Sequence, residues 1–380
     1  MNNYRSVKDM NRHVVYQMIY HNQKISKQEV ALRTGLSLPT VTQNLEKLEK
    51  LGFIRQDGYF ESTGGRKAKA ITIVQDARYS VGVDITKNHL TLVLLDLMNN
   101  IVSSVIREKF RYCDEEEYYD ALGEKIHQFL EGNDVDEKKI LGVGIALPCI
   151  VNSSENKIIN SFENSSITAR VIDAPANIYD KIRRRLAYPT KIFNDANAAG
   201  FAEFWGVESD GMLAYLSLSN SVGGAIIDKS MIYHGSNYRS AEFGHMRLNP
   251  KGRKCYCGQK GCVDVYCAAT VLSDHTDGNL ELFFRKLSEG DSRAREVFDE
   301  YVQNLAGALI NIRMTFDSDI VLGGYVGTYL EEWMPEIRRA VALRNPFERE
   351  ADYLLPCRLK KEAAAVGAGL YFIDDFVESI

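Results

Sequence analysis

One histidine and three cysteines stand close together in the second half of the chain. They follow the spacing His-x9-Cys-x-Cys-x4-Cys, with Gly258 and Gly261 between the last two cysteines, and they are His245, Cys255, Cys257 and Cys262. One imidazole nitrogen and three thiolates form the donor set of a tetrahedral structural zinc site, which leaves no open position for chemistry. The sequence therefore predicts a zinc ion that holds this loop in shape.

The alternative is that these cysteines fill a core or form a disulfide. Cys255 and Cys257 are too close in sequence to bridge each other comfortably, and the surrounding residues are polar: Lys251, Arg253, Lys254, Gln259 and Lys260. This setting favours a solvent-facing metal loop. The remaining cysteines are expected to pack as small apolar residues; Cys113, Cys149 and Cys357 are isolated, and Cys267 lies just beyond the cluster.

The length and composition are those of a globular protein with more than one domain. The chain has 380 residues, of which 45% are hydrophobic and 26% charged, enough for roughly two to three domains. The longest apolar run, from Ile140 to Val151, contains two glycines and a proline, so nothing is expected to span a membrane. Residues 1–10 show no signal-peptide pattern. We expect a cytoplasmic protein, in which free thiols are stable.

The charge is divided unevenly along the chain. The net charge is −5, but residues 1–70 contain twelve Lys or Arg against six Asp or Glu. A basic head on an acidic body indicates that only the head meets a polyanion.

The head has the pattern of a helix-turn-helix. Apolar residues recur at helical spacing within residues 11–21. Ser26 followed by Glu29 resembles a capping box for a second helix over 27–34, which Gly35 would end. Ser37 can cap a third helix, with Pro39 in its first turn and one apolar face made by Val41, Leu45, Leu48 and Leu51.

The third helix is the element that would enter the major groove of DNA. Its outward residues are expected to reach base edges or phosphates; they are Ser37, Leu38, Thr40, Thr42, Gln43 and Asn44.

Residues 53–73 predict a two-stranded wing. A turn is expected at Asp57-Gly58, and residues 64–69 form a Gly-rich basic tip that carries Arg66 and Lys67. These two side chains could enter a minor groove or contact phosphates. The alternative is a small helical interaction module, but helices, wing and charge together favour DNA binding.

From Arg78 onward, strands and helices alternate, which predicts an α/β body with ligands held in loops at strand ends. A meander is expected first, with strands at 79–84, 90–97 and 101–109 and a turn at Asn99-Asn100. Further strands are expected at 140–147, 191–194, 212–217, 224–228 and 320–322, and helices at 116–131 and 294–315.

Several segments resemble successive signatures of the ROK family, which groups bacterial repressors with sugar kinases. They are Phe193-Asn194-Asp195-Ala196-Asn197-Ala198, Ala241-Glu242-Phe243-Gly244-His245, the cysteine loop through Asp264, Val321-Leu322-Gly323-Gly324, and residues 363–368. The resemblance covers essentially the whole chain.

The resemblance implies a two-lobed actin- and hexokinase-like (ribonuclease H-like) body with a sugar in its cleft. We expect the winged head at 1–75, a first lobe at 78–190 plus 362–380, and a second lobe with the zinc loop at 191–361. The implied sugar-binding residues are Asn194, Asp195, Glu242, His245 and Asp264, with Asp195 in the place of the kinase base. Asp264 stands where the family usually has Glu. Carboxylates and amides suit this task because they pair with vicinal hydroxyls.

Two departures from the kinase pattern separate a regulator from an enzyme. Kinase members carry an Asp-x-Gly-Gly-Thr turn and a Gly-Thr-Gly turn, where this chain has Asp84-Ile85-Thr86-Lys87-Asn88 and Ser219-Asn220-Ser221. Glycine lets backbone amides approach phosphates closely, so its loss argues against productive nucleotide binding. An active ATP-dependent sugar kinase remains the alternative, because Lys87 can itself contact phosphate.

These features predict a sugar-responsive transcriptional regulator of the ROK type, a repressor of carbohydrate-utilisation genes without enzymatic activity. It should bind a palindromic operator as a homodimer or higher homo-oligomer, since paired half-sites follow from two-fold symmetry. A protein partner, such as a transporter domain, is an alternative signal to a free sugar. The sequence leaves the identity of the sugar open, including whether it is phosphorylated.

Overall fold

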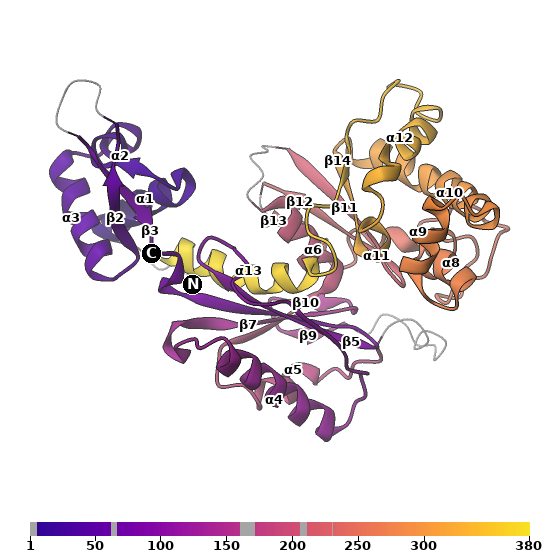
Figure 1. The fold of residues 1–380 in the computed structure, drawn as a ribbon, viewed down its shortest axis with the longest axis horizontal. Helices are drawn as coiled ribbons and strands as arrows, with labels where there is room; N and C mark the ends of the chain where they lie inside the picture. Colours follow the sequence, from indigo (N-terminus) through magenta and orange to yellow (C-terminus); the bar gives the residue numbers. More distant parts are fainter. Residues whose placement is uncertain (1–5, 62–66, 160–171, 206–210, 230) are drawn as a thin grey trace.

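The computed structural model describes residues 6–61, 67–159, 172–205, 211–229 and 231–380. The first lobe of the body lies between the N-terminal head and the second lobe (Figure 1). Within these ranges, no helix is both long and apolar enough to cross a bilayer.

The head is a winged helix-turn-helix. The Ser26 hydroxyl oxygen caps α2 by accepting from the Glu29 N–H, and Gly35 ends α2 with a left-handed φ of 70°. Ser37 caps α3 in the same way, by accepting from the Thr40 N–H. These predicted boundaries are confirmed, but Leu51 is 49% exposed and does not join the buried face. The elements are α1 (Val7–Asn22), β1 (Ile25–Ser26), α2 (Lys27–Thr34), α3 (Leu38–Lys50), β2 (Ile54–Tyr59) and β3 (Lys69–Ile73).

The wing forms as expected, but the predicted turn at Asp57-Gly58 is wrong. These residues lie inside β2, where the pairing with β3 shifts register between Gln56 and Tyr59. Gly58 has a φ of 76°, which glycine adopts readily because it has no side chain. This conformation belongs to a bulge inside β2 and not to the turn that was predicted here. The tip and Arg66 lie outside the described residues.

The first lobe is a five-stranded sheet in the order β10-β7-β4-β5-β6, with a small hairpin of β8 and β9 beside it. The predicted meander is confirmed except that its third strand begins at Ile106, since Ile101 makes only an isolated bridge to Leu95. The elements are η1 (Gln75–Ala77), β4 (Tyr79–Ile85), β5 (His89–Asp96), β6 (Ile106–Lys109), α4 (Glu116–Gly132), η2 (Glu137–Lys139), β7 (Ile140–Leu147), β8 (Val151–Asn152), β9 (Lys157–Ile158), α5 (Ile178–Arg183) and β10 (Thr190–Asn194).

The predicted lobe boundary at residue 190 needs correction. β10 pairs in parallel with β7, so the first lobe runs through Asn194, where the chain turns directly into α6 (Asp195–Phe204).

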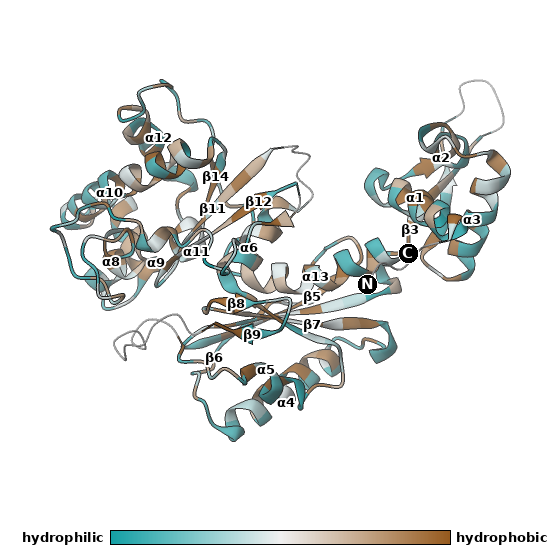
Figure 2. Cartoon of the chain, turned by 180° about the vertical axis from the view of Figure 1, so that it is seen from behind, coloured by the Kyte–Doolittle hydropathy of each residue, from teal (hydrophilic) through white to brown (hydrophobic). Residues whose placement is uncertain are grey.

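The second lobe is a five-stranded sheet in the order β13-β12-β11-β14-β15, covered by helices. Its core and that of the first lobe are separate groups of buried apolar side chains. Surface helices such as α4 and α12 alternate polar and apolar colours along their length, as amphipathic helices do (Figure 2). The elements are β11 (Met212–Leu218), β12 (Val222–Asp228), β13 (Met231–Ile232), η4 (Phe243–His245), α7 (Asp264–Cys267), α8 (Thr270–Ser273), η5 (Asp274–Thr276), α9 (Leu280–Ser288), α10 (Ser292–Phe316), β14 (Asp319–Gly323), α11 (Gly324–Gly327), η6 (Glu331–Trp333), α12 (Met334–Ala342) and β15 (Leu354–Pro356).

The last helix, α13 (Ala363–Ser379), runs along the first lobe toward the head (Figure 1). It packs so closely on the sheet that a Cβ added to Gly82 would lie 1.9 Å from the Ala365 carbonyl oxygen, and one added to Gly144 would lie 1.9 Å from that of Ala368. Glycine in β4 and β7 therefore lets α13 sit directly on the strands.

The C-terminal half of α13 joins the hydrophobic core of the head. Ile373, Val377 and Ile380 belong to the same buried cluster as Val15, Leu48 and other head residues. The Arg12 guanidinium donates to the Ile380 carbonyl oxygen at 3.3 Å. The head and the first lobe thus share one core, built around the end of α13.

Candidate functional site

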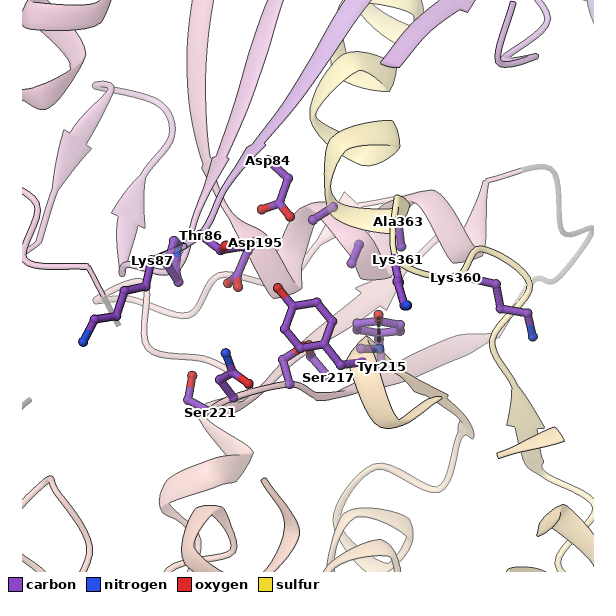
Figure 3. Close-up of a pocket in the computed structure, with 17 residues that line it drawn as sticks. Asp84, Thr86, Lys87, Asp195, Tyr215, Ser217, Ser221, Lys360, Lys361 and Ala363 are labelled. Carbon is purple, nitrogen blue, oxygen red and sulfur yellow. Dashed lines mark hydrogen bonds between the residues drawn. The ribbon is translucent and has the colours of Figure 1, made fainter. Parts of the chain in front are cut away.

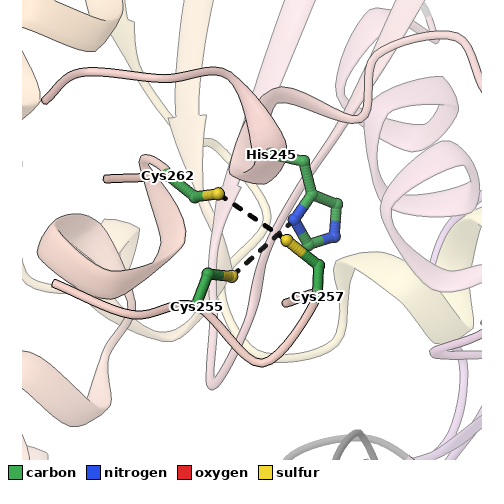
Figure 4. Close-up of side chains that lie close together, drawn as sticks. All are labelled: His245, Cys255, Cys257 and Cys262. Carbon is green, nitrogen blue, oxygen red and sulfur yellow. Dashed lines mark hydrogen bonds between the residues drawn. The ribbon is translucent and has the colours of Figure 1, made fainter. Parts of the chain in front are cut away.

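The four predicted metal ligands converge. The Cys257 and Cys262 sulfurs are 3.7 Å apart, and the Cys255 sulfur lies 3.9 Å from His245 Nδ1. All four ligand atoms lie within 4.8 Å of one another, and Figure 4 shows the imidazole facing the three sulfurs. Ligands on a tetrahedral zinc ion with bonds of about 2.3 Å stand about 3.8 Å apart. The geometry and the donor set therefore fit zinc.

The loop that carries these ligands depends on one glycine in particular. Gly261 has a φ of 76°, and a Cβ there would lie 1.5 Å from the Asn249 carbonyl oxygen. Sequence reasoning did not single out Tyr256, whose hydroxyl lies 3.5 Å from His245 Nε2. The hydroxyl thus lies at the ring nitrogen other than Nδ1, where a group behind a metal ligand usually stands.

A pocket opens between the two lobes, and Asp195 lies in it. Two carboxyl groups line it from the side of the first lobe, Asp84 near the end of β4 and Asp195 at the start of α6 (Figure 3). Lining residues from the second lobe include Tyr215, Ser217 and Tyr325.

Burial raises the pKa of three carboxyl groups in or near this pocket. Burial, together with the charge of Asp195, raises the pKa of Asp84 to about 7, with Arg107 opposing the shift. Burial raises the pKa of Asp195 to about 6. For Glu242, burial and then the charge of Asp195 raise the pKa to about 7. A carboxyl group with a pKa near 7, such as Asp84 or Glu242, is partly protonated at neutral pH and can then both donate to and accept from hydroxyl groups.

Asp84 is a member of this group that the sequence did not assign to the sugar site. Its Oδ1 is buried and has no hydrogen-bond partner among the described residues. A buried carboxyl oxygen without a partner is costly, so a ligand hydroxyl would be a favourable addition. The sequence signal was its position at the end of a buried strand, immediately before the loop that lacks glycines.

The other predicted sugar-binding residues have roles within the protein. The Asn194 side chain accepts from the Asn197 N–H at 2.9 Å and donates to the Cys149 carbonyl oxygen at 3.0 Å, which makes it the N-cap of α6. Asp264 is fully buried and accepts from the Val222 N–H at 2.7 Å. Both side chains thus fix loops beside the pocket, and their contact with a sugar stays a prediction.

The predicted DNA-binding residues divide into exposed and engaged side chains. Leu38, Gln43 and Lys67 are exposed. The hydroxyls at the start of α3 also serve the helix: Thr42 donates to the Leu38 carbonyl oxygen at 2.7 Å, and Ser37 and Thr40 share a hydrogen bond of 2.8 Å.

The expectation that Asn44 faces outward is wrong. It is 8% exposed and donates to the Thr40 carbonyl oxygen at 2.9 Å. The reason is helical spacing, since Asn44 stands three residues after Val41 and four before Leu48, both of them buried.

A winged helix-turn-helix on a two-lobed, hexokinase-like body defines a class of DNA-binding regulator, and comparison with known proteins agrees. Residues 11–55 match the winged helix-turn-helix DNA-binding family, and residues 80–375 match the ROK family. The chain belongs to the ROK family.

Similar proteins of known sequence include transcriptional regulators that match most of this chain. The xylose repressor of Bacillus subtilis (strain 168) is 27% identical over 398 residues, covering 98% of this chain and 97% of that protein. The DNA-binding transcriptional dual regulator NagC of Escherichia coli (strain K12) is 24% identical over 359 residues, covering 88% of this chain and 85% of that protein.

Solved structures show the same division between head and body. A ROK family transcriptional regulator, a homologue of the E. coli MLC protein, superposes with a TM-score of 0.75 at 18% identity and covers 98% of this chain and 97% of its own. A ROK family glucokinase from Streptomyces griseus, in complex with glucose and AMPPNP, has a TM-score of 0.64 at 24% identity and covers 77% of this chain and 98% of its own. The fold of the body is thus common to regulators and kinases.

Proposed function

We propose that this protein is a transcriptional repressor of carbohydrate-utilisation genes whose affinity for operator DNA changes when a sugar binds between its lobes. The proposal is based on one observation: the chain combines a winged helix-turn-helix with a cleft that is lined by Asp84 and Asp195. Similarity to repressors named for xylose and N-acetylglucosamine, over 98% and 88% of this chain, supports it.

The DNA contacts are assigned to the start of α3 and to the wing. Gln43 is exposed on α3, and Lys67 is exposed beside the wing tip. An amide can pair with a base edge, whereas a lysine neutralises phosphate. A homodimer would present two such heads to a palindromic operator.

The sugar is assigned to the carboxyl groups beside the cleft, Asp195 above all, with Asp84 and Glu242 beside it. A ligand that bridges both lobes binds one lobe arrangement better than another, and only such a difference can shift DNA affinity. Because Ala363 and Ala364 line the cleft while the far end of α13 joins the head core, this helix is the route by which lobe movement reaches the head.

The zinc ion, held by His245 and the three cysteines, is assigned a structural role. It would fix the segment that carries Glu242 at the edge of the sugar site, since His245 follows Glu242 by three residues. Four protein ligands fill a tetrahedral shell, so zinc supplies rigidity here and no reactive water.

Catalytic phosphoryl transfer is the second candidate, and the body's likeness to a glucokinase favours testing it. Against it, both turns that would cradle phosphate have side chains where glycine is needed, at Thr86-Lys87 and at Ser219-Asn220-Ser221. Asp195 would then act as a ligand for hydroxyls and not as a base.

Fluorescence anisotropy on DNA from the protein's own promoter region, at fixed salt, tests the proposal. We expect tight binding that one sugar of a panel weakens. Asp195→Asn should remove the sugar effect and keep DNA binding, whereas Gln43→Ala should weaken DNA binding and keep sugar binding.

Tight DNA binding that no sugar alters would contradict sugar control and point to a protein partner as the signal. Sugar-dependent ATP consumption that Asp195→Asn abolishes would establish the kinase.

A further inference from the structure

A second pocket lies within the second lobe, beside the zinc loop. It has a volume of about 370 Å³ and is lined by Arg253 of that loop, by α7, α8 and η5, and by α10. This is the size of a small-molecule site. On α10 the lining positions recur every three or four residues, which is the spacing of one helix face; they are Arg293, Glu296, Val297, Glu300, Tyr301 and Asn304. Among the described residues, none lines both this pocket and the one that contains Asp195.

The buried part of the lining is apolar or aromatic. Val297 is 9% exposed, Tyr266 is 7% exposed and Tyr301 is 1% exposed. The Tyr301 hydroxyl donates to the Cys267 carbonyl oxygen at 2.8 Å, and the Tyr266 hydroxyl accepts from the Arg253 N–H at 3.0 Å. Both hydroxyls are thus engaged within the protein, so the inner wall of the pocket suits the apolar body of a ligand.

The two arginines of the pocket already have counter-ions. Arg253 pairs with Glu300 at 2.9 Å, and its guanidinium lies 5.1 Å from the Tyr266 ring centroid. Arg293 pairs with Glu296 at 2.6 Å. Each guanidinium therefore has a carboxylate of its own, and neither is left to attract an anionic ligand.

One carboxylate of the pocket remains. Asp274 is exposed, and in the described part of the chain it forms no ion pair. With His275 counted as uncharged, the lining holds three carboxylates and two guanidiniums, which gives a net charge of −1. The pocket therefore attracts a cation.

A hydroxyl group without a partner stands one helical turn before Asp274. Thr270 and Asp274 are four residues apart on helical backbone, so they lie on the same side of the helix. Thr270 Oγ1 is buried and has no hydrogen-bond partner among the described residues. Threonine in a helix has two accessible χ1 rotamers, so the hydroxyl can turn toward the pocket that this side chain lines. A donor from a ligand would remove the cost of leaving the hydroxyl unpaired.

We propose that this pocket is a second ligand site, separate from the cleft, which binds a small organic ammonium ion. The ammonium group lies between Asp274 and Thr270, and the apolar body lies against Val297 and Tyr301. An anion fits poorly, because Asp274 repels it and both guanidiniums are paired. A polyol also fits poorly, since the inner wall is apolar.

Isothermal titration calorimetry on the full chain tests this site. The probes are butylamine, cyclohexylamine and benzylamine, which share an ammonium group and differ in their apolar bodies, and the three alcohols of the same skeletons. For at least one pair we expect the amine to bind with a Kd of about 1 mM or tighter. It should bind about 3- to 10-fold more tightly than its alcohol, the range for an exposed ion pair with an added hydrogen bond. Benzoate should bind more weakly than benzylamine.

Three variants locate the amine. Asp274→Asn should lower the affinity for the amine to that for the alcohol and leave the alcohol unaffected. Asp277→Asn is the matched control, because Asp277 is exposed, does not line the pocket, and has a left-handed φ of 53° that Asn also adopts. Asn304→Trp, at a half-buried lining position on α10, should fill the pocket and abolish binding of every probe. Thermal unfolding establishes that the variants remain folded.

The site is excluded if none of the three amines binds, if amine and alcohol bind equally, or if benzoate binds more tightly than benzylamine. It is also excluded if the preference for the amine survives Asp274→Asn, or if binding survives Asn304→Trp, since the amine would then lie elsewhere. These results leave the proposed function untouched, because that function depends on sugar and operator binding.

Discussion

The Phe53 ring of the head stands edge-on to the Phe376 ring of α13, with 5.2 Å between the ring centroids and an interplanar angle of 89°. The Arg78 guanidinium lies 5.2 Å from the Phe53 centroid and 5.8 Å from that of Phe376. Edge-to-face aromatic pairs and cations over rings each add specific attraction to burial. Arg78, at the start of the body, and Phe376, in its last helix, therefore both pack against Phe53 of the head.

Replacing Phe376 should uncouple the head from the sugar site. Phe376→Ala removes the ring that meets Phe53, so we expect a loss of about 2 kcal/mol in unfolding free energy and a smaller effect of sugar on operator affinity. Calorimetry should find sugar binding unchanged. Phe347→Ala, at an aromatic residue that is 79% exposed, is the matched control. A full sugar effect in Phe376→Ala would exclude α13 as the route.

The close packing of α13 on β7 predicts opposite effects of two glycine substitutions. Gly144→Ala would place a Cβ 1.9 Å from the Ala368 carbonyl oxygen, so we expect a strongly lowered melting temperature or failure to fold. Gly132 in α4 has no atom within 4 Å of an added Cβ and no left-handed φ. Gly132→Ala should be neutral or stabilise by up to about 1 kcal/mol. Equal melting temperatures for the two variants would contradict the packing described.

Loss of zinc should lower the stability of the second lobe more than that of the head. Cys257→Ser deletes one of four ligands, and we expect elemental analysis to find less than one zinc per chain and calorimetry to show a lowered melting temperature and weaker sugar binding. Cys113→Ser, at an exposed cysteine, should change none of these. Full zinc content in Cys257→Ser would show that this sulfur is not a ligand.

The buried carboxyl groups predict a stability that falls as pH rises. The pKa values of Asp84 and Asp195, about 7 and about 6 in the folded protein, lie above the value of about 4 for an unfolded aspartate. Between these values the folded state holds more protons than the unfolded state, so the free energy of unfolding decreases with rising pH.

Asp84→Asn removes one of these ionisations and should flatten the curve, with a gain of up to about 4 kcal/mol at pH 8 relative to the unaltered protein. Urea unfolding from pH 5 to pH 8 measures this. Parallel curves for Asp84→Asn and the unaltered protein would refute the burial effect.

Adjacent residues on α3 should behave differently when truncated. Gln43 is exposed, so Gln43→Ala should weaken operator binding by about 1–3 kcal/mol with little effect on stability. Asn44 is buried and bonded to Thr40, so Asn44→Ala should lower the stability of the head. Anisotropy and thermal unfolding together separate the two effects, and the reverse pattern would mean that α3 faces DNA differently.

Local chemistry made the head predictable in detail. Ser26, Gly35 and Ser37 each set a helix end through their own backbone or side-chain preference, and they occupy the expected positions. The same local reasoning misjudged Gly58, because a glycine with positive φ serves a bulge as well as a turn, and only the pairing partner decides between them.

The sequence predicts the metal ligands and most of the carboxyl groups near the cleft, but not how these carboxyl groups are arranged in space. The spacing of His245 and the three cysteines was enough to bring four ligands together. The placement of Asp84 and Asp195 at one pocket, and the burial that shifts their pKa values, depend on how β4 and α6 pack. Such contacts between distant segments leave no periodic signal in the sequence. Lys361 gives no sequence signal for the same reason, since only the fold brings it to this pocket.

The sharing of one core between the head and α13 has a consequence for synthesis. The head leaves the ribosome long before α13 exists, and domains generally fold from the N-terminus as they emerge. Until Ile373 and Val377 arrive, the apolar surface they cover on the head stays open to solvent. The DNA-binding head therefore completes its hydrophobic core only when the end of the chain has been synthesised. A chain truncated before α13 would expose apolar surface on the head and would lack the helix that connects the head to the cleft.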